Sequence, residues 1–230
     1  VTGPVEVRVP DPAGETYATG LIKLTDSSFD LSDLRAGTRG AEVAGRLSLP
    51  LGEGPLGADL SLAATDLGPV FRQAGIGVAG RADGRLRLFP AAGGQGGDLR
   101  LDAGSLRWQA GTARPLAVRQ LTVSGRLADG AGDPEIDLRA EALGVTGPSS
   151  DLERVGLVLE GTPAAAAIRV EADGRVLDAP GALAARLAMR QTPAGPELTL
   201  ESLDGALAEH PLASRTPATL TFPGRGFVLD

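Results

Sequence analysis

Apolar and polar residues alternate along most of this chain with a period of two. Between Ala166 and Val176 the even positions are apolar or small, whereas the odd positions from 169 to 175 are all charged. Successive side chains of a β-strand point to opposite faces, so this alternation predicts a strand with one apolar and one charged face. The same alternation recurs at Val5-Val7-Val9, Leu47-Leu49-Leu51, Leu60-Leu62-Ala64, Leu99-Leu101-Ala103, Leu121-Val123-Gly125-Leu127, Ile136-Leu138-Ala140, Val155-Leu157-Leu159 and Leu198-Leu200.

Clusters of glycine and proline separate these segments. They include "PLGEGPLG" (50–57), "AAGGQGGD" (91–98), "ADGAGDP" (128–134) and "QTPAGP" (191–196). Glycine and proline are the residues that chain reversals favour, and here they recur at the spacing of β-hairpins. The pattern therefore predicts an all-β, antiparallel meander that extends along one axis, as a single continuous unit over residues 1–230.

Helical signals are few. In "TDLGPVFRQAG" Asp66 is placed to cap a short helical turn over residues 66–74. The segment "PGALAARLAMRQ" contains residues that favour helices. Its leucines, Leu183 and Leu187, nevertheless stand at odd positions and its arginines, Arg186 and Arg190, at even ones, as in a strand with one apolar and one charged face. We therefore predict a strand in the second segment.

The composition restricts the function. Hydrophobic residues make up 42% of the 230 residues, but aromatic residues only 3%, so the apolar side chains are aliphatic and small. The net charge of −7 argues against a nucleic-acid partner, which needs a basic surface. Without cysteine, the chain has no disulfide, thiolate metal site or cysteine nucleophile.

Two glycine-rich motifs resemble binding signatures. Gly75, Gly77 and Gly80 fit G-x-G-x-x-G, but a dinucleotide fingerprint needs a strand before it and a helix after it. Here the helical turn comes first and an alternating segment follows, so we interpret these glycines as strand positions. "GGQGGD" (93–98) matches half of a calcium-binding nonapeptide, but a single copy lacks the second ligand set. We expect a hairpin loop there.

No catalytic or metal site is evident. His210 is the sole histidine, and no second histidine, cysteine or G-x-S-x-G motif accompanies it. We interpret it as a turn residue before Pro211. The acidic residues are spread along the charged strand faces. The sequence therefore predicts a non-enzymatic protein without cofactor or metal.

The apolar strand face is the candidate functional feature. It either packs in a closed core or lines an open groove for an apolar ligand, in which each buried methylene is worth about 0.8 kcal/mol. The candidate groove-lining residues are Leu47, Leu49, Leu60, Leu62, Ile76, Val78, Leu86, Leu88, Leu99, Leu101, Leu121, Val123, Leu127, Ile136, Leu138, Leu157, Leu159, Ile168, Val170, Leu198 and Leu200.

Four longer phrases resemble the TamB family, which is related to the AsmA-like and bridge-like lipid transfer proteins. These phrases are "DLGPVFRQAGIGVAGRADGRLRL", "LAVRQLTVSGRLADGAGDPEIDLRAEAL", "LERVGLVLEGTPAAAAIRVEADGRVL" and "LTLESLDGALAEHPLASRTPATLTF". The resemblance lies in the style of L-x-L-x-G strands. His210 stands where that family more often has an aromatic residue.

The resemblance implies a β-sheet folded into a taco-like groove with an aliphatic interior. The implied function is passage of phospholipid acyl chains between the inner and outer membranes of a Gram-negative bacterium. It further implies a periplasmic location, an inner-membrane anchor, and an Omp85-type barrel partner contacted through regions outside this segment. We expect the chain to be an internal part of a longer protein. The alternative is a structural β-solenoid stalk or adhesin with a packed interior.

Overall fold

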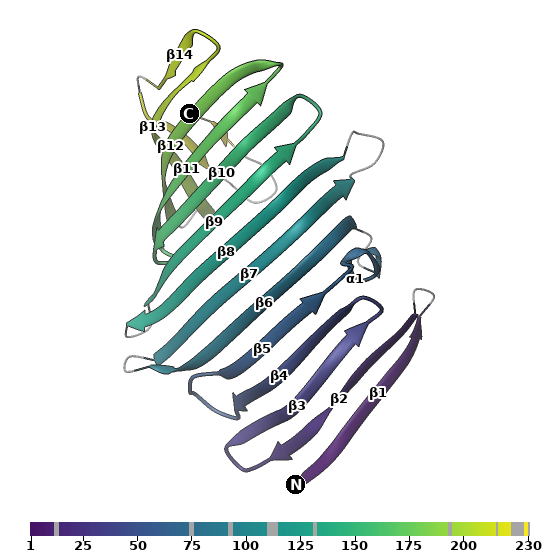
Figure 1. Ribbon diagram of the computed structural model, residues 1–230. Helices are drawn as coiled ribbons and strands as arrows, with labels where there is room; N and C mark the ends of the chain where they lie inside the picture. The colour runs from purple at the N-terminus through teal and green to yellow at the C-terminus, as the bar shows by residue number, and fades with distance from the viewer. Residues whose placement is uncertain are drawn as a thin grey trace.

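The computed structural model describes residues 1–11, 14–73, 76–91, 94–109, 115–130, 133–192, 195–214, 216–221 and 228–229. In these residues one short helix, α1 (Gly68–Gln73), accompanies sixteen strands of a single sheet (Figure 1). The strands are β1 (Thr2–Asp11), β2 (Gly14–Leu24), β3 (Ser28–Thr38), β4 (Ala41–Pro50), β5 (Gly57–Ala64), β6 (Gly77–Ala91), β7 (Gly94–Gln109), β8 (Leu116–Gly130), β9 (Asp133–Thr146), β10 (Ser150–Gly161), β11 (Ala165–Val176), β12 (Ala179–Thr192), β13 (Gly195–Leu207), β14 (His210–Ala213), β15 (Ala218–Thr221) and β16 (Val228–Leu229).

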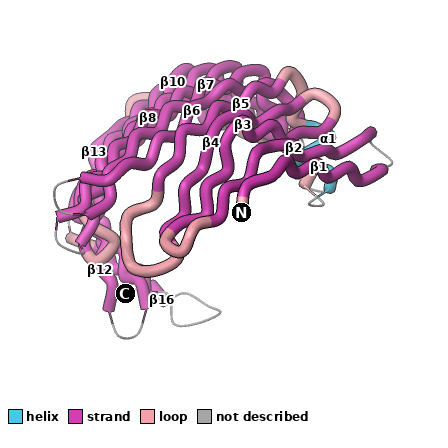
Figure 2. Tube along the Cα trace, turned by 90° about the horizontal axis from the view of Figure 1, so that it is seen from below, coloured by secondary structure: helices cyan, strands magenta, loops and turns pink. Residues whose placement is uncertain are grey.

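The strands follow one another across the sheet in chain order, and every pair is antiparallel. The order changes at β13, where two strands share one edge: β14 pairs with one half of β13 and β15 with the other half. The sheet does not close into a barrel. Figure 2 shows that it curves into an arch with a concave and a convex face. The predicted all-β, curled antiparallel meander is thereby confirmed.

The sheet is a single layer, and this determines how its side chains are buried. Among the described residues the buried apolar side chains are small: Ala58, Ala64, Ala82, Ala103, Ala166, Ala185 and, at the start of α1, Pro69. No large side chain is fully buried, and no polar or charged residue is buried. The hydrophobic side chains therefore share one face of the sheet without a second layer packed on them.

A line of irregular pairing crosses the middle of the sheet from β6 to β10. The pairing shifts by one residue between Ala79 and Arg81, and again between Leu152 and Arg154. Gly80 has φ +139° and Ser105 has φ +54°, both in the region that an L side chain rarely adopts. Bulges bend a strand and increase its twist, so this line accounts for part of the curvature of the arch.

Helix α1 connects β5 to β6 where the two strands differ in length. The Asp66 carboxylate accepts a hydrogen bond of 2.8 Å from the backbone N–H of Gly68, as the predicted cap requires. The backbone N–H of Leu67 donates to the carbonyl oxygen of Gly80 at 2.8 Å. The Leu67 side chain packs against Ala64 and Ala82. This segment covers the short end of β5 and one corner of the apolar face.

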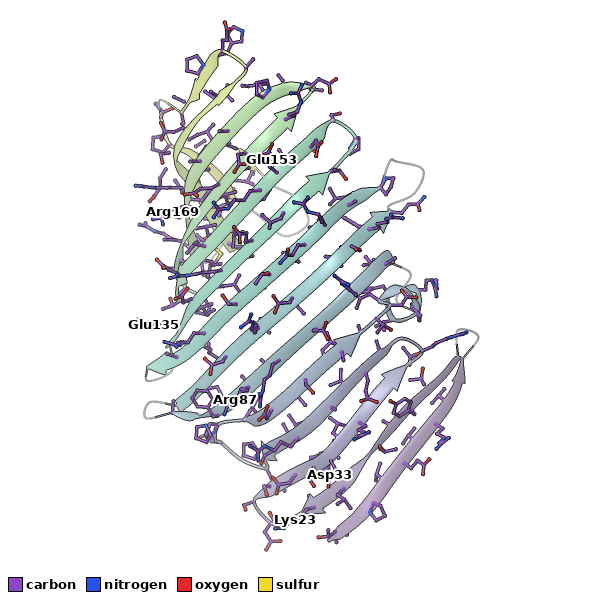
Figure 3. The ribbon with its side chains drawn as sticks, in the orientation of Figure 1. Lys23, Asp33, Arg87, Glu135, Glu153 and Arg169 are labelled. Atoms are coloured by element: carbon purple, nitrogen blue, oxygen red, sulfur yellow. The ribbon has the colours of Figure 1, made fainter. Side chains whose placement is uncertain are left out.

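The convex face carries the charges. Figure 3 looks onto this face, on which Lys23, Arg87, Glu135 and Arg169 lie. Ion pairs join neighbouring strands across it, among them Arg154–Glu141 at 2.7 Å. These groups are exposed, so each pair is worth at most about 1 kcal/mol. The charges keep this face in water and thereby assign the apolar residues to the other face.

Three local interpretations of the sequence need correction. His210 begins the short strand β14 opposite Leu207, because the chain turns at Ala208, which has φ +54°. The "AAGGQGGD" segment is mostly strand, since β6 extends to Ala91 and β7 begins at Gly94. Gly80 lies at a bulge and is not a regular strand position. Gly75 lies outside the described residues.

No helix in the described part of the chain has the length and hydrophobicity needed to cross a lipid bilayer.

Candidate functional site

The apolar face is continuous because the strand pairing aligns the alternating residues of neighbouring strands. One row of directly opposed residues crosses nine strands, β5 to β13: Leu60, Leu86, Leu99, Gly125, Leu138, Leu159, Ile168, Leu187 and Leu200. Adjacent strands are about 4.8 Å apart, so this row is about 38 Å long. It forms a strip of aliphatic side chains that runs across the strands along the arch.

Parallel rows widen the strip on both sides. On one side, Leu101 faces Val123, and Leu157 faces Val170. On the other side, Leu127 faces Ile136. Among paired strand positions whose side chains are described, this face has no aspartate, glutamate, lysine or arginine. The surface can therefore desolvate an aliphatic ligand without leaving a charge unpaired.

The face is concave, since the charged residues lie on the convex side of the arch (Figures 2 and 3). It is also largely uncovered. At the α1 corner Leu67 packs on it from outside the strands, against the cluster of Ala64, Ala82 and Ala103. Elsewhere the larger side chains are only partly buried, and Trp108 remains 50% exposed. The arrangement is an open trough with an aliphatic lining.

The structure brings together all of the predicted lining residues except Ile76. Ile76 lies before β6 and is 41% exposed, and its backbone N–H donates to the carbonyl oxygen of Phe71. It belongs to the connection after α1 because β6 begins only at Gly77. The others occupy one face by register, from Leu47 and Leu49 on β4 to Leu198 and Leu200 on β13.

Sequence reasoning missed part of this face. Leu106, Val118, Val145 and Leu152 face one another in register and extend it toward the α1 end of the strands. Each lies beyond the line of bulges, where strict alternation is out of phase. The sequence feature that could have indicated a bulge is a glycine beside a polar residue within an apolar segment, as in Gly104-Ser105.

Two titratable groups with shifted pKa values lie on the convex side. Hydrogen bonds from the hydroxyls of Ser48 (2.5 Å) and Ser28 (2.9 Å) lower the pKa of Asp30. The Tyr17 hydroxyl donates to Glu42 at 2.5 Å, and this bond raises the pKa of Tyr17. Neither group faces the apolar trough, so their titration does not alter the charge of its lining.

Comparisons with protein families, with curated proteins and with solved structures find no match to this chain. The geometry of the trough is thus the basis for assigning a function. In the described part of the chain, no group of histidine, aspartate or glutamate residues is placed to hold a metal ion.

Proposed function

We propose that the concave face binds the acyl chains of phospholipids and conducts them along the sheet, in the manner of TamB-type lipid transfer proteins. The observation that carries the proposal is the uncharged aliphatic trough that crosses successive strands and has no second layer over it. An exposed apolar face of this extent is typical of a binding surface. A methylene that the trough covers completely gains about 0.8 kcal/mol, and no polar recognition is required.

The proposal extends to the cellular location and the partners of the protein. The protein acts without catalysis in the periplasm of a Gram-negative bacterium, as part of a longer chain anchored in the inner membrane. An Omp85-type barrel is contacted through regions outside this segment. The motif resemblance in the strands supports this setting, as does the direction of the trough, which runs across the strands and therefore lengthens with each strand added.

The alternative is a structural stalk, in which the apolar face packs against something else and binds no lipid. The single layer and the partly buried leucines favour the groove over a packed interior. A stalk needs a sealed core to be rigid, and a sealed core contains fully buried large side chains. None is present among the described residues.

Lipid retention tests the proposal. The chain is expressed in bacteria and purified in mild detergent, and co-purifying lipid is measured by mass spectrometry. We expect phospholipid with the parent and a loss of most of it with Leu86→Asp, which places a charge in the trough. Arg87→Asp is the matched control, because Arg87 is the next residue but lies on the convex face. Equal retention by both variants, or none by a folded parent, would refute the groove.

Trp108 provides a second readout that needs no mutation in the trough. It is the sole tryptophan, lies in register with Val78 on the apolar face, and is half exposed. A brominated fatty acid quenches indole fluorescence on contact. We expect saturable quenching, with unlabelled palmitate as competitor. Quenching that increases linearly and resists competition would show collision and no binding.

A further inference from the structure

A second hollow lies on the convex face, on the opposite side of the sheet from the trough. It has a volume of about 380 Å³ and is lined by Arg139, Arg154, Arg169, Ser124 and Glu171 around Gly156. These residues come from four neighbouring strands, β8 to β11. The lining combines the charged side chains with Glu141 and with apolar groups such as Val158, so the hollow differs from the uncharged aliphatic trough.

Gly156 has no evident role in folding. A Cβ built on it would meet no atom within 4 Å, and its φ lies outside the left-handed region. Gly205, in contrast, is constrained by packing, because a Cβ on it would come within 2.4 Å of the carbonyl oxygen of Ala182. Glycine inside a strand costs roughly 0.5–1 kcal/mol relative to alanine. A glycine inside a strand often marks a bulge, a bend, or a place that a ligand or another backbone approaches closely, and the last of these fits the open space over Gly156.

The charge around the hollow is unbalanced at Arg169. This residue lies directly opposite Arg186 on β12, and like charges in that position repel. The comparable pair, Arg85 opposite Arg100, is compensated, because Arg85 is 2.9 Å from Asp59 and Arg100 has its own carboxylate partner. In the described part of the chain, neither Arg169 nor Arg186 forms an ion pair.

The other two arginines of the hollow already have partners. Arg154 lies 2.7 Å from Glu141, and Arg139 lies 3.4 Å from Asp137. These pairs hold two guanidinium groups at the rim. Guanidinium groups bind phosphate and carboxylate through paired N–H donors. The hollow thus combines one uncompensated cation with two positioned ones.

We propose that the hollow over Gly156 binds a phosphorylated or carboxylated sugar. Arg169 binds the oxyanion, with Arg139 and Arg154 as further donors. The Ser124 hydroxyl and the Glu171 carboxylate are placed to bond to sugar hydroxyls. A hollow of about 380 Å³ has room beside the oxyanion for a hydroxylated ring. The site is independent of lipid binding, since it lies on the other face.

The test is titration calorimetry with glucose 6-phosphate and galacturonate, with inorganic phosphate and glucose for comparison. We expect both anionic sugars to bind, phosphate at least tenfold more weakly, and glucose not at all. Arg169→Gln should weaken sugar-phosphate binding at least tenfold. Arg87→Gln is the control, because Arg87 also lies exposed on the convex face without an ion pair among the described residues.

Gly156→Val separates binding from folding. Valine fills the hollow and meets no atom at its Cβ, so the variant should unfold at the same urea concentration as the parent or higher, yet lose sugar-phosphate binding. Ala63→Val, on the convex face of β5, controls for an added side chain. Binding that survives Gly156→Val, or that Arg169→Gln and Arg87→Gln weaken equally, would overturn the site. So would the absence of binding to the folded parent.

Discussion

Truncating a leucine in the trough should cost less than truncating one in a closed core. Leu159 lies in the central row between Leu138 and Ile168 and is only partly buried. Leu159→Ala removes three carbons, which at about 0.8 kcal/mol each would cost roughly 2.4 kcal/mol if fully buried. Most of that burial is present, and no enclosed cavity is left, so we expect a loss of about 2 kcal/mol. In packed cores the same change costs about 2–5 kcal/mol.

Urea denaturation measures this difference, with an unchanged m-value as the sign that only stability has altered. Val158→Ala is the companion variant, since Val158 is the next residue, partly buried on the convex face. The two losses should lie within about 1 kcal/mol of each other. If Leu159→Ala cost about 3 kcal/mol or more, the face would be covered in solution, and the reasoning from an open trough would fail.

Three further variants test other features. Leu67→Ala should cost about 3 kcal/mol in urea, more than Leu159→Ala, because Leu67 packs on the buried alanines beside α1 and its truncation leaves a cavity there; an equal or smaller loss would mean that this corner is open. The double variant Pro4→Thr, Pro10→Thr should self-associate in sedimentation velocity. Both prolines face the unpaired edge of β1, and replacing them supplies backbone N–H groups with which another strand can pair. A variant as monomeric as the parent would contradict this. Folding lowers the pKa of Asp30, so its stabilising effect exists above the unfolded value of about 3.9 and is lost as the pH falls through the lower folded value. Thermal melts of Asp30→Asn should therefore approach those of the parent only below about pH 4, and a gap that persists there would exclude the hydrogen bonds as its cause.

The sequence was sufficient to predict the strands and their common face, because a period of two is a direct record of which side chains meet water. Arg169 and Ile168 differ by one position and lie on opposite faces, as their chemistry requires. The same logic predicted the strand at Leu183 to Leu187 despite its helix-favouring alanines. These predictions depended on local pattern alone, and in this protein neighbouring strands are also neighbours in the chain.

What the sequence could not show was the position of the bulges and the shape of the sheet. One extra residue at Ser105 returns Leu106 to the face of Ala103, and no composition rule fixes that residue in advance. Nor could alternation distinguish an open trough from a closed core, because both have the same pattern in each strand. The hollow over Gly156 could not be predicted either, since the open space around this glycine is evident only in the folded structure.

The strict chain order of the strands has a consequence for how the molecule forms. Each hairpin can pair as soon as its two strands exist, without waiting for a distant part of the chain, so the entropic cost of closing long loops is avoided. The protein can then assemble one strand at a time, starting with its first hairpin, as its chain emerges from a ribosome. Strands could be added or lost in evolution on the same principle, changing the span of the molecule while leaving its cross-section intact.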